Sequence, residues 1–225
     1  MRIIISGATG MVGSEAIRQA LLDKDIASVT AIVRKPLEIT NPKLKVILHK
    51  DFLNFENLLE TFKENDACLW CLGISQTRVK SEEEYHAITY DYAVNAASAM
   101  LKANPEMRFL FLSGMGADSL EKSRTLFARI KGKTENALLK IYSNNLYIVR
   151  PGGIKPAQKN PNSPLAERLL YPFFPIFKLL MPSMMITAVQ LSQVMLYLVK
   201  KAGQNQLMEN KELLSIWKDK LYPHL

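Results

Sequence analysis

The sequence is poor in the residues that build redox and metal centres. Its 225 residues include two cysteines and three histidines. Cys68 and Cys71 form a C-x-x-C spacing, which occurs in redox pairs and zinc sites, but they lie in an apolar run typical of a buried strand. Residues three apart on a strand point to opposite faces, and the sequence has no second cysteine pair to complete a metal site. We interpret both cysteines as core residues and expect no metal and a reducing, cytoplasmic location.

Long uninterrupted apolar runs are also absent. The most apolar stretch, residues 165–182, is broken by Pro172, Pro175 and Lys178, whereas a membrane-spanning helix needs about 20 apolar residues. We therefore predict no transmembrane segment, and the N-terminal run is too short for a signal peptide. Two interpretations of residues 165–182 stay open: a lid over the edge of a sheet, which we favour, and an apolar surface that contacts a partner or a bilayer.

Acidic residues are outnumbered by basic ones, which gives a formal net charge of +8. The basic residues are scattered and do not alternate with aromatic residues as they do in grooves that bind single-stranded nucleic acid. We predict a solvated basic surface, phosphate contacts in one small-molecule site and no nucleic-acid partner. The oligomeric state stays open, a homodimer included.

What the sequence does contain is a regular alternation of short apolar runs and helical patterns over its first 150 residues. This alternation predicts an α/β protein with a doubly wound parallel sheet, the Rossmann fold with strand order 3-2-1-4-5-6. The expected strands are Arg2–Ser6, Ser28–Val33, Leu44–Leu48, Ala67–Leu72, Arg108–Ser113 and Leu146–Arg150. The expected helices are Val12–Asp23, Phe55–Glu64, Glu82–Ala103 and Leu120–Tyr142, the third of which starts with a capping box at Ser81 and Glu84.

The pattern changes after Arg150, where prolines and glycines interrupt regular structure. An amphipathic helix capped by Thr187 is expected to run to Lys201, and a terminal helix is expected over Asn210–Leu221. We predict a single domain, residues 1–225, in which residues 151–225 form a small, mainly helical cap on the substrate side.

A glycine-rich turn follows the first expected strand and opens the first helix. Gly7, Gly10 and Gly13 have the spacing G-x-x-G-x-x-G, which allows a tight turn, close approach of a pyrophosphate and close packing of helix on strand. The anion would lie at the helix N-terminus. Because the turn stands at a strand-to-helix junction, it predicts a dinucleotide site, with Thr9, Met11 and Val12 as further contacts.

Two basic residues, Arg34 and Lys35, follow the second strand, where an acidic residue would bind the ribose 2′-hydroxyl of NAD(H). A guanidinium there can bind a 2′-phosphate instead, so we predict NADP(H) as the cofactor. Residues at the ends of the third and fourth strands are expected to contact the adenine and the central ribose region; these are Asp51, Phe52, Leu72 and Gly73.

With these residues placed, the sequence resembles the atypical short-chain dehydrogenase/reductase superfamily. The similarity is strongest to the Tat-interacting-protein-like oxidoreductases, with relatives among the NAD-dependent epimerases and dehydratases. It rests on GATGMVG, CLGISQTR, FLSGMGADS and YIVRPGGI. The resemblance implies an active-site serine after the fifth strand and a Tyr-x-x-x-Lys motif on the next helix. Ser113 matches the serine and Lys131 the lysine, but Phe127 occupies the tyrosine position and has no hydroxyl for proton transfer.

Three functions follow from these observations. The first is an NADP(H)-dependent oxidoreductase or epimerase-like enzyme for a small carbonyl compound, which would use Ser113 and Lys131 with a substitute proton donor such as water or Tyr90. Lys131 would also contact the cofactor. The second is a non-catalytic NADP(H) sensor or partner-binding module. The third is nucleic-acid binding, which is supported only by the positive net charge.

Overall fold

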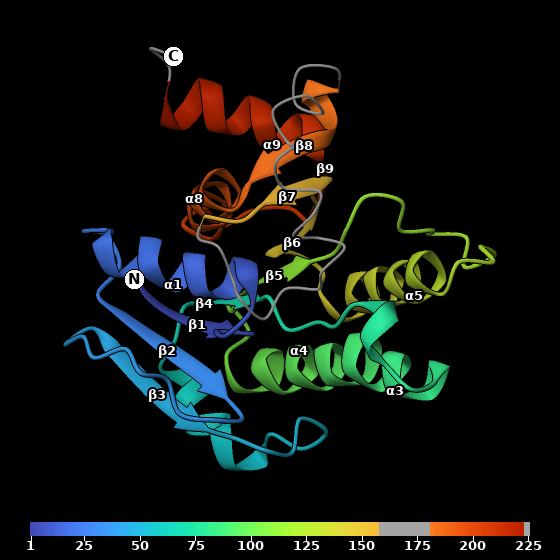
Figure 1. Cartoon of the computed structure of the whole chain (residues 1–225). Coiled ribbons are helices and arrows are strands. Elements are labelled where there is room, and N and C mark those ends of the chain that lie inside the picture. The colour runs from blue at the N-terminus through green and yellow to red at the C-terminus, as the bar shows by residue number, and fades with distance from the viewer. Residues whose placement is uncertain (158–180, 223–225) are drawn as a thin grey trace.

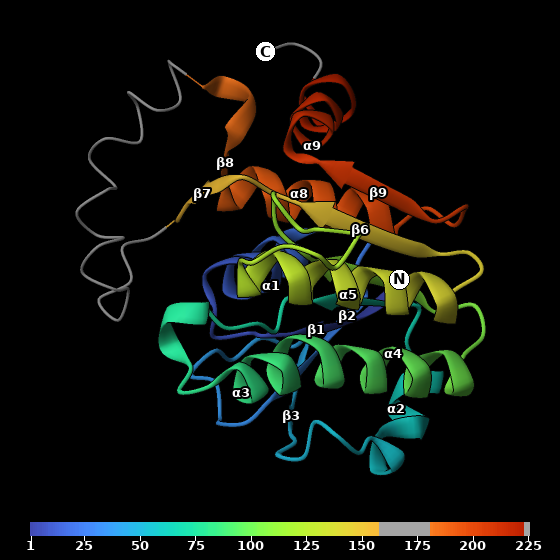
Figure 2. The ribbon, with the colours of Figure 1, turned by 90° about the vertical axis from the view of Figure 1, so that its right-hand side faces the viewer.

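The computed structural model describes residues 1–157 and 181–222, and in them the chain is built around a seven-stranded parallel sheet (Figure 1). The strands are β1 (Arg2–Ser6), β2 (Ser28–Val33), β3 (Leu44–Leu48), β4 (Ala67–Trp70), β5 (Arg108–Leu112), β6 (Leu146–Arg150) and β9 (Gln206–Glu209). Their order is β3-β2-β1-β4-β5-β6-β9. Figure 2 shows the two ends of the sheet, with β3 near the bottom and β6 and β9 near the top. The predicted fold and strand order are confirmed, and β9 adds a strand that the sequence did not indicate.

Helices cover both faces of this sheet (Figure 1). One face carries α1 (Met11–Leu22) and α8 (Ala188–Val199), which pack against each other. The opposite face carries α2 (Leu59–Lys63), α4 (Tyr92–Ala103) and α5 (Leu126–Ile141). The shorter elements are the 3₁₀ helices η1 (Glu56–Leu58), η2 (Gln76–Arg78) and η5 (Pro182–Met184), the helices α3 (Glu82–His86) and α9 (Asn210–Ile216), and the π-helical segments η3 (Ala87–Asp91) and η6 (Trp217–Leu221).

The central strands are apolar on both faces because each face is covered by helices. In β1, Ile3 and Ile5 face the cluster under α1 and α8, whereas Ile4 faces the cluster under α2 and α4. The two cysteines follow the same alternation: Cys68 lies in the second cluster and Cys71 packs against the first. Both thiols are free, and Cys68 is buried in the core as expected. Cys71 differs from the expectation: it follows the end of β4 and is only partly buried.

The helices expected over residues 55–64 and 210–221 are each divided, into η1 and α2 and into α9 and η6. Two more expected helices differ from the prediction. The helix expected over residues 82–103 is interrupted by η3, whose wider turn a hydrophobic pattern does not reveal. The helix expected from Leu120 begins at Leu126, because the carboxylate of Asp118 accepts backbone N–H groups of Leu120, Lys122 and Ser123 and holds that stretch as a loop.

The C-terminal part is helical, as predicted, and two of its elements join the central layers. Thr187 and Gln190 form a capping box at the start of α8, and β9 pairs with β6. A second, two-stranded sheet pairs β7 (Gly153–Lys155) with β8 (Met185–Thr187). The apolar stretch 165–182 lies, except for its last two residues, outside the described residues. No helix in the described part of the chain is long and apolar enough to cross a membrane.

Candidate functional site

The turn after β1 can be built only with glycine at two of its positions. Gly7 has φ +68°, and a Cβ atom there would lie 2.5 Å from the Cys71 carbonyl oxygen. At Gly13 a Cβ atom would lie 2.2 Å from the Gly7 carbonyl oxygen. The turn is closed by the N–H of Gly10, which donates to Gly7 over 2.9 Å. Backbone packing therefore requires glycine at the first and third glycine positions of the spacing seen in the sequence.

The N-terminus of α1 emerges from this turn without a cap of its own. The first intrahelical bond runs from the N–H of Ser14 to the Gly10 carbonyl oxygen (3.0 Å). The N–H groups of the first turn, Met11 to Gly13, have no intrahelical acceptor, and neither a capping side chain nor an acidic residue of that turn satisfies them. With the positive end of the helix dipole, they fit the pyrophosphate of a dinucleotide.

A cleft of about 640 Å³ extends from this turn across the ends of β2 and β3. We call it the β2 cleft; it is lined by Gly7, Ala8, Thr9, Ile32, Val33, Arg34, Lys35, Lys50, Phe52 and Leu72. The lining contains three cations and no carboxylate. Lys50 was missed by the sequence analysis, although its place two residues after β3, which lies beside β2 in a parallel sheet, could have indicated it.

The four residues predicted to contact the cofactor at the strand ends do not all line the same cleft. Phe52 and Leu72 line the β2 cleft. Asp51 does not: it is exposed, and its carboxylate accepts the N–H of Leu53 over 3.0 Å. Gly73 lines a second cleft, on the far side of Leu72.

This second cleft, the β5 cleft, has a volume of about 460 Å³ and lies where β4 and β5 end. It is lined by Gly10, Met11, Val12, Cys71, Leu72, Gly73, Ile74, Ser75, Gln76, Thr77, Tyr85, Leu112, Ser113, Phe127, Lys131 and Ile154. The structure thus brings the two residues predicted to be catalytic together beside the N-terminus of α1. Leu72 lines both clefts, so the two form a continuous site along the carboxyl edge of the sheet.

Ser113 is buried and its hydroxyl donates to Oε1 of Glu135. Glu135 lies on α5, is completely buried, and accepts from Nε of Arg150 (2.9 Å) and from its Nη2. Arg150 stands at the end of β6, and its Nη1 also donates to Glu209 at the end of β9 (2.9 Å). The hydrogen bonds that Arg150 donates to Glu135 raise the pKa of Arg150 above its usual range.

Lys131 is the other polar group at the floor of the β5 cleft. Its Nζ donates to the Leu112 carbonyl oxygen over 2.8 Å and lies 4.6 Å from the centre of the Phe111 ring. Burial lowers the pKa of Lys131 to about 8, although the negative charge of Glu135 opposes the shift. Burial raises the pKa of the neighbouring Cys71 thiol to about 12, so this thiol stays neutral.

Phe127 stands where the resemblance places a tyrosine. Its ring lies over Gly114, 2.7 Å from the position that a Cβ atom would take there. Tyr90, the substitute considered from the sequence, does not line the cleft; its ring packs against His86 (4.7 Å) and under Lys133 (4.9 Å). The tyrosine that does line the cleft is Tyr85, which has no exposed surface.

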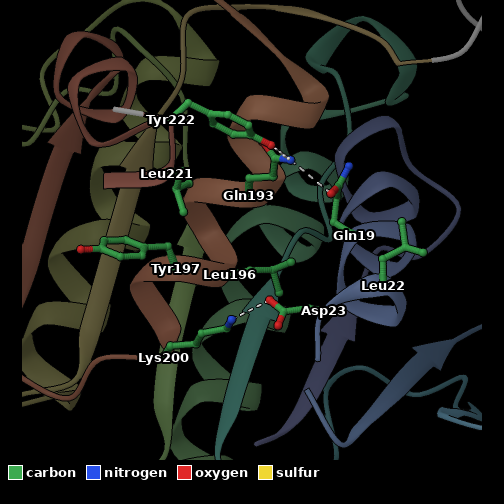
Figure 3. A pocket seen from close by; sticks show the side chains of 9 residues that line it. All are labelled: Gln19, Leu22, Asp23, Gln193, Leu196, Tyr197, Lys200, Leu221 and Tyr222. Atoms are coloured by element: carbon green, nitrogen blue, oxygen red, sulfur yellow. Dashed lines mark hydrogen bonds and ion pairs between the residues drawn. The ribbon is translucent and has the colours of Figure 1, made fainter. Parts of the chain in front are cut away.

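A third cavity, of about 240 Å³, lies between α1, α8 and the last helical turn, η6 (Figure 3). Its polar side chains bind one another: Gln193 donates to Tyr222 (3.0 Å) and to Gln19 (3.4 Å), and Lys200 pairs with Asp23 (2.6 Å). None of its lining residues belongs to the two clefts described above. Among the described residues no group of three or more His, Cys, Asp or Glu could hold a metal ion.

Comparison with known proteins agrees with the geometry of the turn and the clefts. Residues 7–167 match the model of a family described as NAD(P)H-binding. The chain belongs to this family. The match begins at the first glycine of the turn and includes Ser113, Lys131 and Arg150. The resemblance to atypical short-chain dehydrogenases/reductases is thereby confirmed, and the cofactor is a nicotinamide dinucleotide.

Three relatives illustrate how far the similarity extends. The chain is 29% identical over 158 residues to the FMP52 protein of Candida albicans, an alignment that covers 68% of this chain and 67% of that protein. For FMP52 of Meyerozyma guilliermondii the aligned share of the relative is 64%, so the chain spans less than two thirds of its length. Rat HTATIP2 is 25% identical over 230 residues, which cover 99% of this chain and 92% of that protein.

Solved structures share the fold at lower identity. MoeE5, determined with UDP-glucuronic acid and NAD, superposes with a TM-score of 0.71 at 13% identity over 97% of this chain and 82% of its own. The Bordetella bronchiseptica enzyme WbmH, determined with NAD⁺, superposes with a TM-score of 0.68 at 15% identity over 92% of this chain and 74% of its own. These likenesses show a Rossmann-like fold.

The comparisons correct one expectation. The cytoplasmic location predicted from the sequence is contradicted by the FMP52 relatives, which are named as mitochondrial proteins. The prediction was wrong because unpaired cysteines indicate only a reducing compartment and do not distinguish one such compartment from another.

Proposed function

We propose that this protein is an NADP(H)-dependent oxidoreductase that interconverts a small carbonyl compound and its alcohol. The observation that carries the proposal is the meeting of Ser113, from the end of β5, and Lys131, from α5, in a cleft that adjoins the glycine turn. A bound nicotinamide cofactor would supply or accept the hydride. The chain would hold that cofactor at the α1 N-terminus and position the substrate oxygen beside Ser113 and Lys131.

The preference for NADP(H) rests on the charges of the β2 cleft. Arg34, Lys35 and Lys50 line it and are exposed, so they are free to approach a 2′-phosphate from the ends of two neighbouring strands. No carboxylate in the lining is available for the 2′-hydroxyl of NAD(H). A dianionic phosphate would be bound more tightly there than a hydroxyl because three cations surround its position.

The cofactor preference is tested with Arg34→Ala. A hydrogen bond to a charged group contributes about 1.5–3 kcal/mol, so the affinity for NADPH should fall roughly 10- to 150-fold, while the affinity for NADH should hardly change. Arg124→Ala is the matched control, since Arg124 is exposed and lines neither cleft. Titration calorimetry with both cofactors measures the effect. Equal or tighter binding of NADH by the parent protein would contradict the preference.

Phe127 favours a second candidate, a non-catalytic NADP(H) sensor or partner-binding module. The cleft has the serine and the lysine but lacks the phenol of the family motif. Oxidation of NADPH is therefore measured against a panel of aldehydes and ketones, in the parent protein and in Lys131→Ala and Phe127→Tyr. Turnover that is lost in Lys131→Ala supports the enzyme. Tight NADPH binding without turnover in the parent, with turnover gained in Phe127→Tyr, supports the sensor.

A further inference from the structure

Glu135 was not indicated by the sequence analysis, yet it governs the polarity of the β5 cleft. Its carboxylate is fully buried and accepts from Nε (2.9 Å) and Nη2 of the same guanidinium, Arg150. Arg150 is held in turn by Glu209 (2.9 Å) and by the hydroxyl of Ser119 (2.9 Å). A carboxylate paired in this way with a guanidinium is ionised and can only accept hydrogen bonds.

Because the Glu135 carboxylate can only accept, the hydroxyl of Ser113 must be the donor in the hydrogen bond between them. A serine hydroxyl has one proton, and that of Ser113 is donated to Oε1 of Glu135. Within the described residues the Ser113 Oγ has no other hydrogen bond. Its remaining lone pairs are therefore what the side chain offers to a ligand, so Ser113 is an acceptor in this cleft.

Lys131, in contrast to Ser113, is a hydrogen-bond donor in this cleft. Its ammonium group has three protons, of which one is donated to the Leu112 carbonyl oxygen. The other titratable groups near its Nζ are Glu135 on the same helix and the neutral thiol of Cys71. Tyr85 lines the same cleft but has no exposed surface. The β5 cleft is thus lined by both a donor, Lys131, and an acceptor, Ser113.

We propose that the β5 cleft recognises the alcohol form of the substrate, whose hydroxyl donates to Ser113 and accepts from Lys131, and that Lys131 is the residue that exchanges the proton. A carbonyl oxygen can only accept, so it would bind Lys131 and face the lone pairs of Ser113. The proposal rests on the proposed function. Oxidation starts from the neutral amine of Lys131, whose lone pair can accept a hydrogen bond, so the alcohol hydroxyl turns its single proton from Ser113 to Lys131. That proton then passes to the amine, the hydride leaves carbon for the oxidised cofactor, and the C–O bond becomes double. Reduction reverses each transfer.

Burial of Lys131 supports the proton exchange, because it brings the pKa of the amine to about 8, where both protonation states are populated near neutral pH. With Lys131 exchanging the proton, the site needs no tyrosine hydroxyl in place of Phe127. Glu135 acts through Ser113 as a positioning residue.

The test uses 2-propanol and acetone, which differ only in oxidation state, added to the protein loaded with NADP⁺. Binding is followed by NMR of the Lys131 side chain. A single hydrogen bond contributes about 0.5–1.5 kcal/mol, so 2-propanol should bind about 3- to 10-fold more tightly than acetone. Ser113→Ala, which leaves the Glu135–Arg150 pair intact, should abolish this preference. In Glu135→Gln the amide can donate to Ser113 and free its proton for the ligand, so the preference should reverse.

Ser119→Ala is the control, since it removes one partner of Arg150 but not the Ser113–Glu135 bond, and it should keep the preference. Tighter binding of acetone by the parent, or no response of Lys131 to either compound, overturns the proposal. The proposal is also overturned if Ser113→Ala still binds 2-propanol more tightly than acetone.

Hydride transfer from 2-propanol to NADP⁺ separates this proposal from the proposed function. The rate should rise with pH and level off above about pH 8, and Lys131→Met should lose both the rate and its pH dependence. If 2-propanol is preferred but no hydride is transferred, the oxidoreductase function fails while the recognition stands. If Lys131→Met keeps the parent's rate and pH profile, the proton role of Lys131 is wrong while the oxidoreductase function stands.

Discussion

Gly13→Ala is the sharpest test of the glycine turn, because two opposite effects act at that position. Gly13 lies inside α1, where alanine normally stabilises a helix by about 0.5–1 kcal/mol relative to glycine. The added Cβ atom would, however, lie 2.2 Å from the Gly7 carbonyl oxygen and 2.7 Å from its carbonyl carbon. Both are backbone atoms, so they cannot rotate away as a side chain would.

The close contact should outweigh the helix propensity. Non-bonded carbon atoms are most stable about 3.5–4.0 Å apart, so the turn would have to move by roughly 1 Å. Such overpacking costs about 1–3 kcal/mol, and for a domain of this size each kcal/mol lowers the melting temperature by about 2–4 °C. Less the helix gain of about 0.5–1 kcal/mol, we expect a net fall of up to roughly 10 °C. The same shift would displace the N–H groups that face the pyrophosphate, so NADPH should bind at least about tenfold more weakly.

The assay combines thermal unfolding with NADPH titration, and Gly10→Ala is the matched variant. Gly10 has an ordinary φ of −81°, and its added Cβ atom would lie 3.2 Å from the Gly7 carbonyl oxygen. Its melting temperature should stay close to that of the parent, although the extra methyl group at the exposed turn can still hinder NADPH. If Gly13→Ala melts at the parent temperature and binds NADPH with the parent affinity, the packing argument for the turn is refuted.

Three further predictions concern the interior. Arg150→Met leaves the buried carboxylate of Glu135 without its cation and should lower the free energy of unfolding by about 3–5 kcal/mol in urea titrations; a loss below 1 kcal/mol would mean that the pair is not desolvated. Gly132→Ala would place a Cβ atom 1.8 Å from the Asp118 carbonyl oxygen, so its melting temperature should fall while that of Ala137→Gly, on the same helix, should change only by helix propensity. Lys131 has a pKa of about 8 when folded and 10.5 as its ordinary value. The unfolded chain therefore binds more protons between these values, and stability should rise with pH across that window, by an amount on the order of 3 kcal/mol; a parent curve parallel to that of Lys131→Met would contradict the shift.

The sequence by itself determined the layers of the fold and the cofactor turn, because both depend on local rules. Continuous apolar runs predict strands buried on both faces, and six of these became β1 to β6 in the predicted order. Gly7, Gly10 and Gly13 could be interpreted from spacing alone, since a strand, a tight turn and a helix N-terminus are consecutive along the chain. β9 escaped prediction because its four residues, QLME, form no apolar run.

Only the tertiary structure decided what the second cleft can do. Ser113, Glu135 and Arg150 come from β5, α5 and β6, and their hydrogen bonds depend on how those elements pack. Lys50 and Tyr85 likewise reached the clefts through strand register and helix placement. Periodicity specifies which face a residue occupies, but it carries no information on which distant side chains meet at the edge of a sheet. The contact between Ser113, Glu135 and Arg150 sets the direction of the Ser113 hydrogen bond. That direction in turn decides which form of the substrate we expect the cleft to prefer.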